Sequence, residues 1–252
     1  MITSVSDLDI EILYYLDIES IIHLSLITKY QYALISNLDF IKELLTLKYP
    51  GIKSLVLVDI AASNNCLLLL EWLSKSVNIF KYTPSAIDEA CRKGHIGVLE
   101  WFNKSGYKMR YTWEAIDLAS YNGHINILEW FRNSGLEYEY ERAIDYAALK
   151  SHIDILDWFH NYGLDFAYDF KIVAKASLLV LEWFKNAKYE IEYYEVLKHA
   201  VKHEHIDILE WLKLSGFKLI YKKMIKHIDP SKNHKVTKWF ADNHYVNSDI
   251  NF

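Results

Sequence analysis

Apolar residues recur along the chain in a long-period pattern built around tryptophan. Successive tryptophans of this series are 29, 29, 28, 25, 28 and 28 residues apart, and they are Trp72, Trp101, Trp130, Trp158, Trp183, Trp211 and Trp239. Self-similarity at a fixed period of about 20 to 50 residues is typical of stacked repeat proteins. The pattern therefore predicts seven copies of one unit, with the tryptophans as their buried spine, at about 55–82, 83–111, 112–140, 141–168, 169–193, 194–221 and 222–249.

Each copy predicts two helices joined by a short turn. In the third copy the first helix is expected to begin near Ala115, and Gly123-His124 marks the turn. Apolar side chains in residues 125–131 cover most of the circumference of the second helix. Such a helix is buried on two sides, as expected where every unit packs against both neighbours. Gly135 is expected to end it, because glycine adopts a left-handed backbone at no steric cost.

Two further residue types keep a fixed distance from the tryptophan. A tyrosine follows it by ten residues in six copies, at Tyr82, Tyr111, Tyr140, Tyr168, Tyr193 and Tyr221. An acidic residue directly precedes it at Glu71, Glu100, Glu129, Asp157, Glu182 and Glu210. Six matches at one register predict a structural role for the tyrosines. Several of the acids have a base three or four residues later, which supports an exposed helix edge.

The third copy resembles an ankyrin repeat. Residues 114–120, Gly123-His124, residues 125–131 and Gly135 match that family's pattern, and the resemblance extends over residues 55–249. It implies helix–turn–helix units stacked into a solenoid that serves as a protein-binding surface. The units are shorter than the roughly 33 residues of that family, and the residues missing are those of its projecting β-hairpin. We therefore expect an all-α, ankyrin-like helical-hairpin solenoid with short connectors and little strand, occupying residues 55–252 and including a C-terminal cap.

Residues 1–54 lack the tryptophan pattern and predict a separate helical module. The runs at residues 8–16 and 21–29 resemble an F-box, a family that docks on the adaptor subunit of cullin–RING ubiquitin ligases. The resemblance implies docking through Leu8, Ile12, Leu13, Leu16, Ile21 and Leu24. The alternative is a helical cap that shields the first repeat from water, which repeat arrays need.

The ankyrin resemblance also implies where a partner binds. In that family the variable residues of the concave face lie just before the first helix, or between its alanine pair and the Gly-His turn. Carried onto this chain, they are Arg92, Lys93, Trp113, Tyr121, Asn122, Glu141, Lys150, Tyr194, Lys202 and His203. Trp113 is the one tryptophan outside the periodic series, and tryptophan, tyrosine and arginine often dominate binding energy. The alternatives are packing of Trp113 on a connector, and a solvated face for the charged residues.

Charge is distributed unevenly around a formal net of −5. Residues 136–210 hold 15 acids and 8 bases, whereas residues 211–240 hold 8 lysines and one aspartate. The basic end is read first as a solvated terminal face. The alternative is binding of nucleic acid or of an acidic partner through residues 211–240.

The sequence holds no catalytic or metal-binding motif that we recognise. The two cysteines, Cys66 and Cys91, fall in different registers, which indicates reduced thiols. Histidine recurs six residues before the tryptophan at His95, His124, His152 and His205. Neighbouring copies would hold these rings about 10 Å apart, too far for one ion, so we expect hydrogen bonds that stabilise the turns. We expect no enzyme, no metal and no cofactor.

Location and function follow from these patterns as expectations. No apolar run reaches the roughly 18 residues needed to span a membrane, and no signal-peptide layout is present. The short, tyrosine-rich copies resemble those of large DNA viruses, which implies the host cytoplasm. The function predicted is protein–protein interaction, in its most specific form as a substrate-recruiting adaptor of a cullin–RING ligase. The alternatives are a plain binding scaffold and nucleic-acid binding through residues 211–240.

Overall fold

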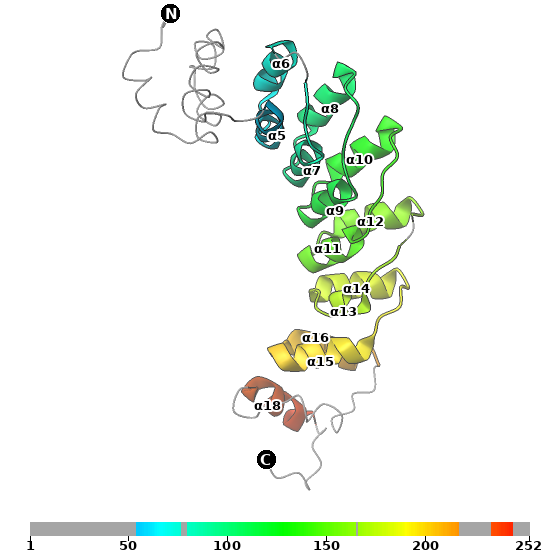
Figure 1. The fold of residues 1–252 in the computed structure, drawn as a ribbon. Coiled ribbons are helices and arrows are strands. Elements are labelled where there is room, and N and C mark those ends of the chain that lie inside the picture. The colour runs from blue at the N-terminus through cyan, green and yellow to red at the C-terminus, as the bar shows by residue number, and fades with distance from the viewer. Residues whose placement is uncertain (1–53, 77–79, 165, 217–232, 244–252) are drawn as a thin grey trace, which may run out of the picture. The chain divides into compact units, whose positions relative to one another are not determined.

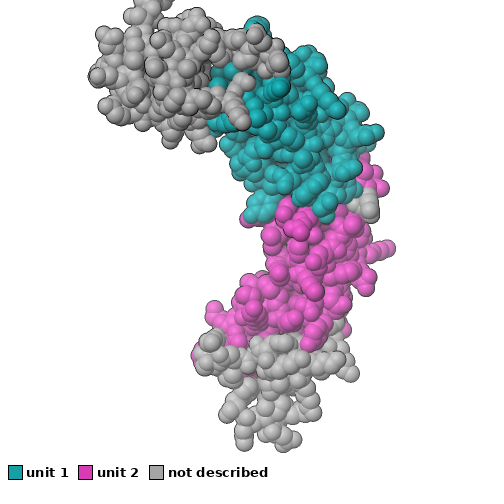
Figure 2. Space-filling view, viewed as in Figure 1, with its two compact units in different colours: residues 1–141 teal, residues 142–252 magenta. Residues whose placement is uncertain are grey.

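The computed structural model describes residues 54–76, 80–164, 166–216 and 233–243, and the regular elements among them are all helices. This confirms the all-α prediction, and the low strand content expected of short connectors, for the described residues. The chain divides into two compact units, residues 1–141 and 142–252 (Figure 2). Apart from its last residue, the module predicted at residues 1–54 lies outside the described part of the chain.

Unit 1 places its helices in two rows (Figure 1). Its helices are α5 (Ser54–Ser63), α6 (Leu67–Ser76), α7 (Ser85–Arg92), α8 (Ile96–Ser105), α9 (Glu114–Tyr121) and α10 (Ile125–Ser134). The first helix of each copy packs on the first helix of the next, α5 on α7 and α7 on α9. The second helices α6, α8 and α10 form the other row in the same way. Each copy in this unit is thus a helix pair, as the period predicts.

Unit 2 follows the same plan with one shortened copy (Figure 1). Its helices are α11 (Ala143–Lys150), α12 (Ile153–Asn161), α13 (Phe170–Val173), α14 (Leu178–Asn186), α15 (Tyr193–His203), α16 (Ile206–Leu214) and α18 (His234–Asp242). The first helices α11, α13 and α15 pack in series, while α16 contacts both α14 and α18. The four-residue α13 belongs to the copy whose tryptophan interval is only 25 residues.

In the first four copies and the sixth, the turn between the two helices has a left-handed backbone at one register position, seven residues before the tryptophan. Glycine holds this position in the second and third copies, where Gly94 and Gly123 have φ of 73° and 74°. Asn65, Ser151 and Glu204 hold the same position elsewhere, with φ between 55° and 61°. Packing of the two helices therefore enforces the turn even where the side chain disfavours it.

The largest fully buried side chains belong to the residue that follows the tryptophan. Phe102, Phe131, Phe159, Phe184 and Phe240 are all fully buried. Of the tryptophans, Trp158, Trp211 and Trp239 are buried, but Trp101, Trp130 and Trp183 are only partly buried. The prediction that the indoles form the buried spine is therefore wrong for the latter three. Phenylalanine has no polar atom and can be enclosed completely, whereas the indole N–H needs a partner.

The indole N–H groups find that partner in the copy before. Nε1 of Trp101 donates to Glu71 at 3.0 Å, and Nε1 of Trp183 donates to Asp157 at 2.7 Å. Trp239 donates to Glu210 in the same way at 2.5 Å. The acid that directly precedes one tryptophan thus accepts from the next tryptophan, which links neighbouring second helices.

The first helices are linked by a series of aspartates, of which Asp88, Asp117 and Asp145 are buried and Asp59 is partly buried. Oδ1 of Asp59 accepts the backbone N–H of Thr83 at 2.9 Å, and Oδ1 of Asp88 accepts that of Thr112 at 3.0 Å. The same bond joins Asp117 to Glu141 and Asp145 to Asp169, at 3.2 and 2.8 Å. Every acceptor lies 13 residues before its tryptophan, so the bond repeats once per copy.

The periodic tyrosines also connect successive copies, in agreement with the structural role predicted for them. The hydroxyl of Tyr82 donates to the carbonyl of Lys108, and that of Tyr111 donates to the carbonyl of Glu137. Tyr168 donates to the carbonyl of Glu190 at 2.8 Å. Each acceptor lies in the connector that follows the next second helix. Side chains at fixed register positions therefore satisfy backbone groups that would otherwise lack a partner.

Candidate functional site

Each unit carries a polar groove on its first-helix side. The groove of unit 1, which we call the turn groove, has a volume of about 580 Å³. Its lining comes from the turns of three successive copies and includes Asn64, Arg92, Lys93, His95, Asn122 and His124. The groove of unit 2, which we call the lysine groove, has a volume of about 450 Å³ and is built around Lys171, Lys175, Lys198 and Lys202. Both volumes fall in the range of roughly 300 to 1,000 Å³ that is typical of ligand sites.

The turn groove forms because α5, α7 and α9 end at equivalent positions in successive copies. Ser63 and Arg92 are the last residues of α5 and α7, and each lies nine residues before its tryptophan. Asn64, Lys93 and Asn122 come directly after these helices, eight residues before the tryptophan. Stacking of the copies brings equivalent positions side by side, so that one groove is lined by different side chains at one register.

Charge in the turn groove is partly fixed by an ion pair. The Arg92 guanidinium donates from Nε and from its terminal nitrogen to Oε2 of Glu89, at 2.8 and 2.6 Å, which raises the pKa of Arg92. Burial, and then the charge of Lys93, lower the pKa of His95. The His124 ring packs against the turn at Gly94. The groove therefore presents the ion-paired guanidinium of Arg92, the ammonium group of Lys93, and the amide and imidazole groups of its asparagine and histidine side chains.

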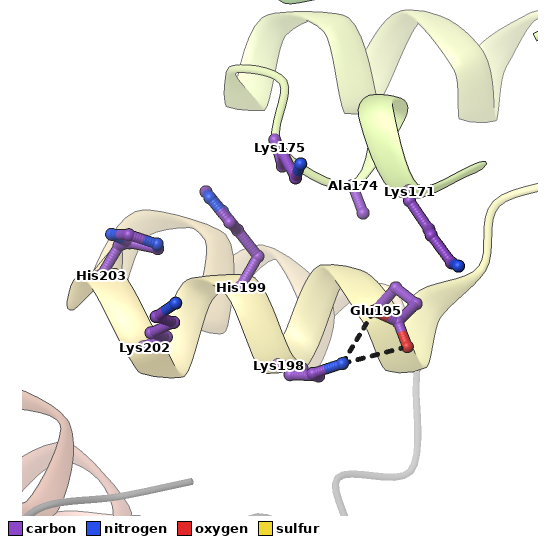
Figure 3. Close-up of a pocket in the computed structure, with 8 residues that line it drawn as sticks. All are labelled: Lys171, Ala174, Lys175, Glu195, Lys198, His199, Lys202 and His203. Atoms are coloured by element: carbon purple, nitrogen blue, oxygen red, sulfur yellow. Dashed lines mark hydrogen bonds and ion pairs between the residues drawn. The ribbon is translucent and has the colours of Figure 1, made fainter. Parts of the chain in front are cut away.

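The lysine groove lies between α13 and α15 (Figure 3). Lys171 belongs to α13 and Lys175 follows it by four residues, while Lys198 and Lys202 lie four residues apart on α15. Residues four apart share one face of a helix, which applies to Lys198 and Lys202, whereas Lys175 lies in the turn beyond the end of α13. Glu195, on the same face of α15, pairs with Lys198 at 3.2 Å between Oε2 and Nζ. The dashed lines of Figure 3 mark this ion pair, with Lys171 and Lys175 across the groove.

His199 borders the lysine groove with a polar atom that is not satisfied. Its Nδ1 is buried and has no hydrogen-bond partner among the described residues. Burial, followed by the charges of His203 and His205 and then of Lys175 and Lys202, lowers the pKa of His199 to about 4. The imidazole is therefore neutral at pH 7. Its ring centroid lies 4.4 Å from that of His203 and 5.6 Å from that of His205.

The structure brings together half of the partner-binding residues predicted from the sequence. Arg92, Lys93 and Asn122 line the turn groove, and Lys202 and His203 line the lysine groove. The remaining five line neither groove, and they are Trp113, Tyr121, Glu141, Lys150 and Tyr194.

The five residues outside the grooves lie on several different elements. Trp113 precedes α9 with its side chain 37% exposed. Glu141 and Lys150 have exposed side chains, while Tyr121 and Tyr194 are partly buried on α9 and α15. The six predicted ligase-docking residues, from Leu8 to Leu24, lie outside the described part of the chain.

The sequence analysis missed several groove residues, including Asn64, His95 and His124 in the turn groove and Lys171, Lys175, Lys198 and His199 in the lysine groove. Lys171, Lys198 and His199 lie at positions that the ankyrin resemblance does not mark as variable, and Lys175 lies in the shortened fifth copy, for which no variable residue was predicted. The available signal was the repetition of lysine at an interval of four residues in both elements, at 171 and 175 and again at 198 and 202. That signal indicates one charged helix face in each element, but it does not say that the two faces meet.

Comparisons with known proteins give no further guide to the function. No protein-family model matches the chain, and no curated protein matches its sequence. Within the described residues, no group of three or more histidine, cysteine, aspartate or glutamate side chains is placed to hold a metal ion. None of the described helices has both the length and the apolar character needed to cross a bilayer. The geometry of the grooves therefore carries the functional argument.

Proposed function

We propose that this chain is a non-catalytic protein-binding scaffold of ankyrin-like helical hairpins. The observation that carries the proposal is that both grooves draw on the same two register positions, nine and eight residues before the tryptophan. In unit 1 these positions supply Ser63, Asn64, Arg92, Lys93 and Asn122, and in unit 2 they supply Lys202 and His203. Part of the register that the resemblance marks for binding thus lines a groove, while Tyr121 and Lys150, at the same two positions, line neither groove.

Side-chain variety supports recognition at these positions. The residue eight before the tryptophan is Asn64, Lys93 and Asn122 in the first three copies. By contrast, the aspartate 13 residues before the tryptophan is the same in all of the first four copies. Repeats that keep their packing residues and vary their surface residues can present a specific surface on a common framework. A binding scaffold explains this division between constant and variable positions.

An affinity comparison of two matched variants tests the proposal. The groove variant combines Arg92→Ala, Lys93→Ala and Asn122→Ala. The control combines Asn103→Ala, Lys104→Ala and Asn133→Ala, three exposed residues near the ends of α8 and α10. Partners captured by the wild-type chain are quantified by mass spectrometry, and direct binding of the purified partner is then measured.

We expect the groove variant to weaken direct binding about tenfold or more and the control to leave it unchanged. Equal binding of one purified partner by wild type, groove variant and control would overturn the assignment of the turn groove. Circular dichroism of both variants excludes unfolding as the cause of a loss.

The more specific hypotheses stay predictions from the sequence. A substrate-recruiting adaptor of a cullin–RING ligase requires the F-box-like module at residues 1–54. Nucleic-acid binding requires the lysines of residues 211–240, of which 217–232 lie outside the described residues. The plain scaffold needs neither segment.

A further inference from the structure

We propose that the lysine groove of unit 2 binds a short acidic segment of a partner protein, through the carboxylates of several aspartate or glutamate residues. The lysine groove is defined above by Lys171, Lys175, Lys198 and Lys202. This inference rests on the proposed function, since it names the chemistry of a partner that a protein-binding scaffold would take at one of its two grooves.

The first observation is that the lysine groove is positively charged although the stretch of sequence that contains it is acidic. Residues 136–210 carry 15 acids and 8 bases, a net of 15 minus 8, or seven negative charges. Four of those eight bases line the lysine groove, but only one of the fifteen acids does, namely Glu195. The groove therefore has a net of three positive charges inside an acidic stretch. Charges that served only to solvate the surface would not be separated in this way.

The second observation is that three of the four groove lysines form no ion pair with a described carboxylate. Glu195 is paired with Lys198 at 3.2 Å. No ion pair joins Lys171, Lys175 or Lys202 to any described acidic residue. Like charges held near one another repel, and an anion placed between them removes that repulsion. Three ammonium groups on two neighbouring elements thus form a site for a ligand with several negative charges.

His199 borders the same site with a partly buried ring. Its Nδ1 has no partner among the described residues, but this atom is buried and is not open to a ligand in the groove. A ring N–H donates a hydrogen bond to a carboxylate in either the neutral or the protonated state. The imidazole is therefore compatible with an oxyanion ligand, whereas the lysines supply the charge that selects it.

Size and surroundings favour an acidic peptide over nucleic acid. The cavity has a volume of only about 450 Å³, and it lies within residues 136–210, which carry a net negative charge outside the groove. Proteins that bind single strands without sequence preference stack the bases on aromatic rings. The described residues that line this groove include no phenylalanine, tyrosine or tryptophan. A short acidic segment meets the lysines without these conflicts.

Fluorescence polarisation with the full chain tests the proposal. The probe is a labelled ten-residue peptide rich in aspartate and glutamate, and its control has asparagine and glutamine in their place. The groove variant is Lys175→Glu with Lys202→Glu, at two exposed side chains. The matched variant is Lys104→Glu with Lys188→Glu, at two exposed side chains, which makes the same change of charge outside the groove. Lys175→Gln with Lys202→Gln removes the charge without reversing it.

We expect the acidic peptide to bind, the neutral peptide not to bind, and affinity to fall as salt rises. The Glu variant should weaken binding at least about 30-fold, the Gln variant about tenfold, and the matched variant less than about threefold. Absence of binding to the acidic peptide, or equal losses in the groove and matched variants, would overturn the proposal. Tighter binding of a single-stranded oligonucleotide of equal charge would replace it with a nucleic-acid site.

Failure here is distinguishable from failure of the proposed function. A scaffold that used only the turn groove would lose its purified partner in the Arg92, Lys93 and Asn122 variant and still ignore the acidic peptide. In that case the scaffold function would stand, while the chemistry assigned to the lysine groove would be wrong.

Discussion

A Cβ atom at Gly94 would lie 2.8 Å from Nδ1 of His124, so the imidazole of one copy occupies the space beside the turn of the copy before it. Gly94 also has φ of 73°, in the left-handed region. A side chain at this position would therefore meet two separate obstacles, one in the backbone and one in the packing. This contact gives His124 a packing role beside the turn of the preceding copy.

Gly94→Ala is expected to lower the free energy of unfolding by about 2 to 4 kcal/mol, from backbone strain of about 1–2 kcal/mol and from overpacking against His124. Gly106→Ala is the matched control, since Gly106 has φ of 77° but no atom within 4 Å of the added Cβ. Urea unfolding of both variants separates the two contributions. Equal losses in the two variants would show that the imidazole moves aside at no cost.

Phe131 and Trp130 are adjacent, but the structure predicts different roles in stability. Phe131 is fully buried, whereas Trp130 is only partly buried. Phe131→Ala should cost about 3–5 kcal/mol, as for other buried aromatic side chains. Trp130→Ala should cost less, about half as much, because part of its surface stays in water. Thermal and urea unfolding measure both values. A larger loss of stability for Trp130→Ala than for Phe131→Ala would contradict this prediction and would support the indoles as the main buried side chains.

Asp88 is expected to act through its hydrogen bonds to the next copy rather than through its charge. Its Oδ1 accepts the backbone N–H of Thr112, and its Oδ2 accepts the Thr112 hydroxyl at 3.0 Å. Asp88→Ala leaves that N–H without a partner and should cost about 1–3 kcal/mol. Asp88→Asn can keep both contacts, since its amide N–H₂ can donate to the hydroxyl, and should cost less than about 1 kcal/mol at pH 7.

The same pair of variants has a defined pH dependence. Burial raises the pKa of Asp88 above its ordinary value of 3.8, in spite of the bonds from Thr112. The carboxyl therefore contributes stability that is full below pH 3.8 and is lost as pH rises through the raised folded-state pKa. Asparagine does not ionise, so the stability of Asp88→Asn relative to wild type should improve between pH 3 and pH 7. An opposite trend in urea unfolding would contradict the direction of this pKa shift.

Turn chemistry explains why the helix boundaries could be predicted from the sequence. Gly135, with φ of 73°, directly follows α10 at Ser134, as the sequence predicts. The Gly123-His124 pair likewise separates α9 from α10. Local backbone preferences suffice for such boundaries, because they depend on a few adjacent residues.

Relations between copies are harder to predict from the sequence. A period shows that Trp130 and Phe131 both recur, but it does not show which of the two faces the interior. The lysine groove depends on packing of α13 against α15, which brings Lys175 beside Lys202 across an interval of 27 residues. No local pattern encodes that contact, whereas the shortening of the copy that holds α13 is visible in its tryptophan interval of 25 residues.

The F-box-like module gives a prediction that needs no structure of residues 1–54. Substitution of Leu13→Asp with Leu16→Asp in the full chain should abolish capture of the purified ligase adaptor subunit. The variant of Arg92, Lys93 and Asn122 described above is the control and should capture the adaptor normally. If the wild-type chain retains no adaptor, the alternative of a shielding cap is favoured, and deletion of residues 1–54 should then produce aggregation alone.

His199 makes stability depend on pH in a predictable direction. Burial first, and then the charges of His203, His205, Lys175 and Lys202, lower the pKa of His199 to about 4 from an ordinary value of 6.5. The unfolded chain therefore binds the proton more readily between pH 6.5 and pH 4. Stability linked to this group is fully present above pH 6.5 and is lost as pH falls through that window.

His199→Gln should remove this loss, because glutamine does not titrate. A full shift of that size would exceed 3 kcal/mol at about 1.4 kcal/mol per pKa unit, but the ring is partly exposed and solvent screening reduces the effect to about 1 to 2 kcal/mol. Urea unfolding of both proteins at pH 7.5, 5.5 and 4.5 measures the difference, and NMR titration of the ring measures the pKa directly. A titration midpoint near 6.5, or parallel pH profiles of wild type and variant, would contradict the prediction. Addition of the acidic peptide should raise the midpoint, since bound carboxylates favour the protonated ring.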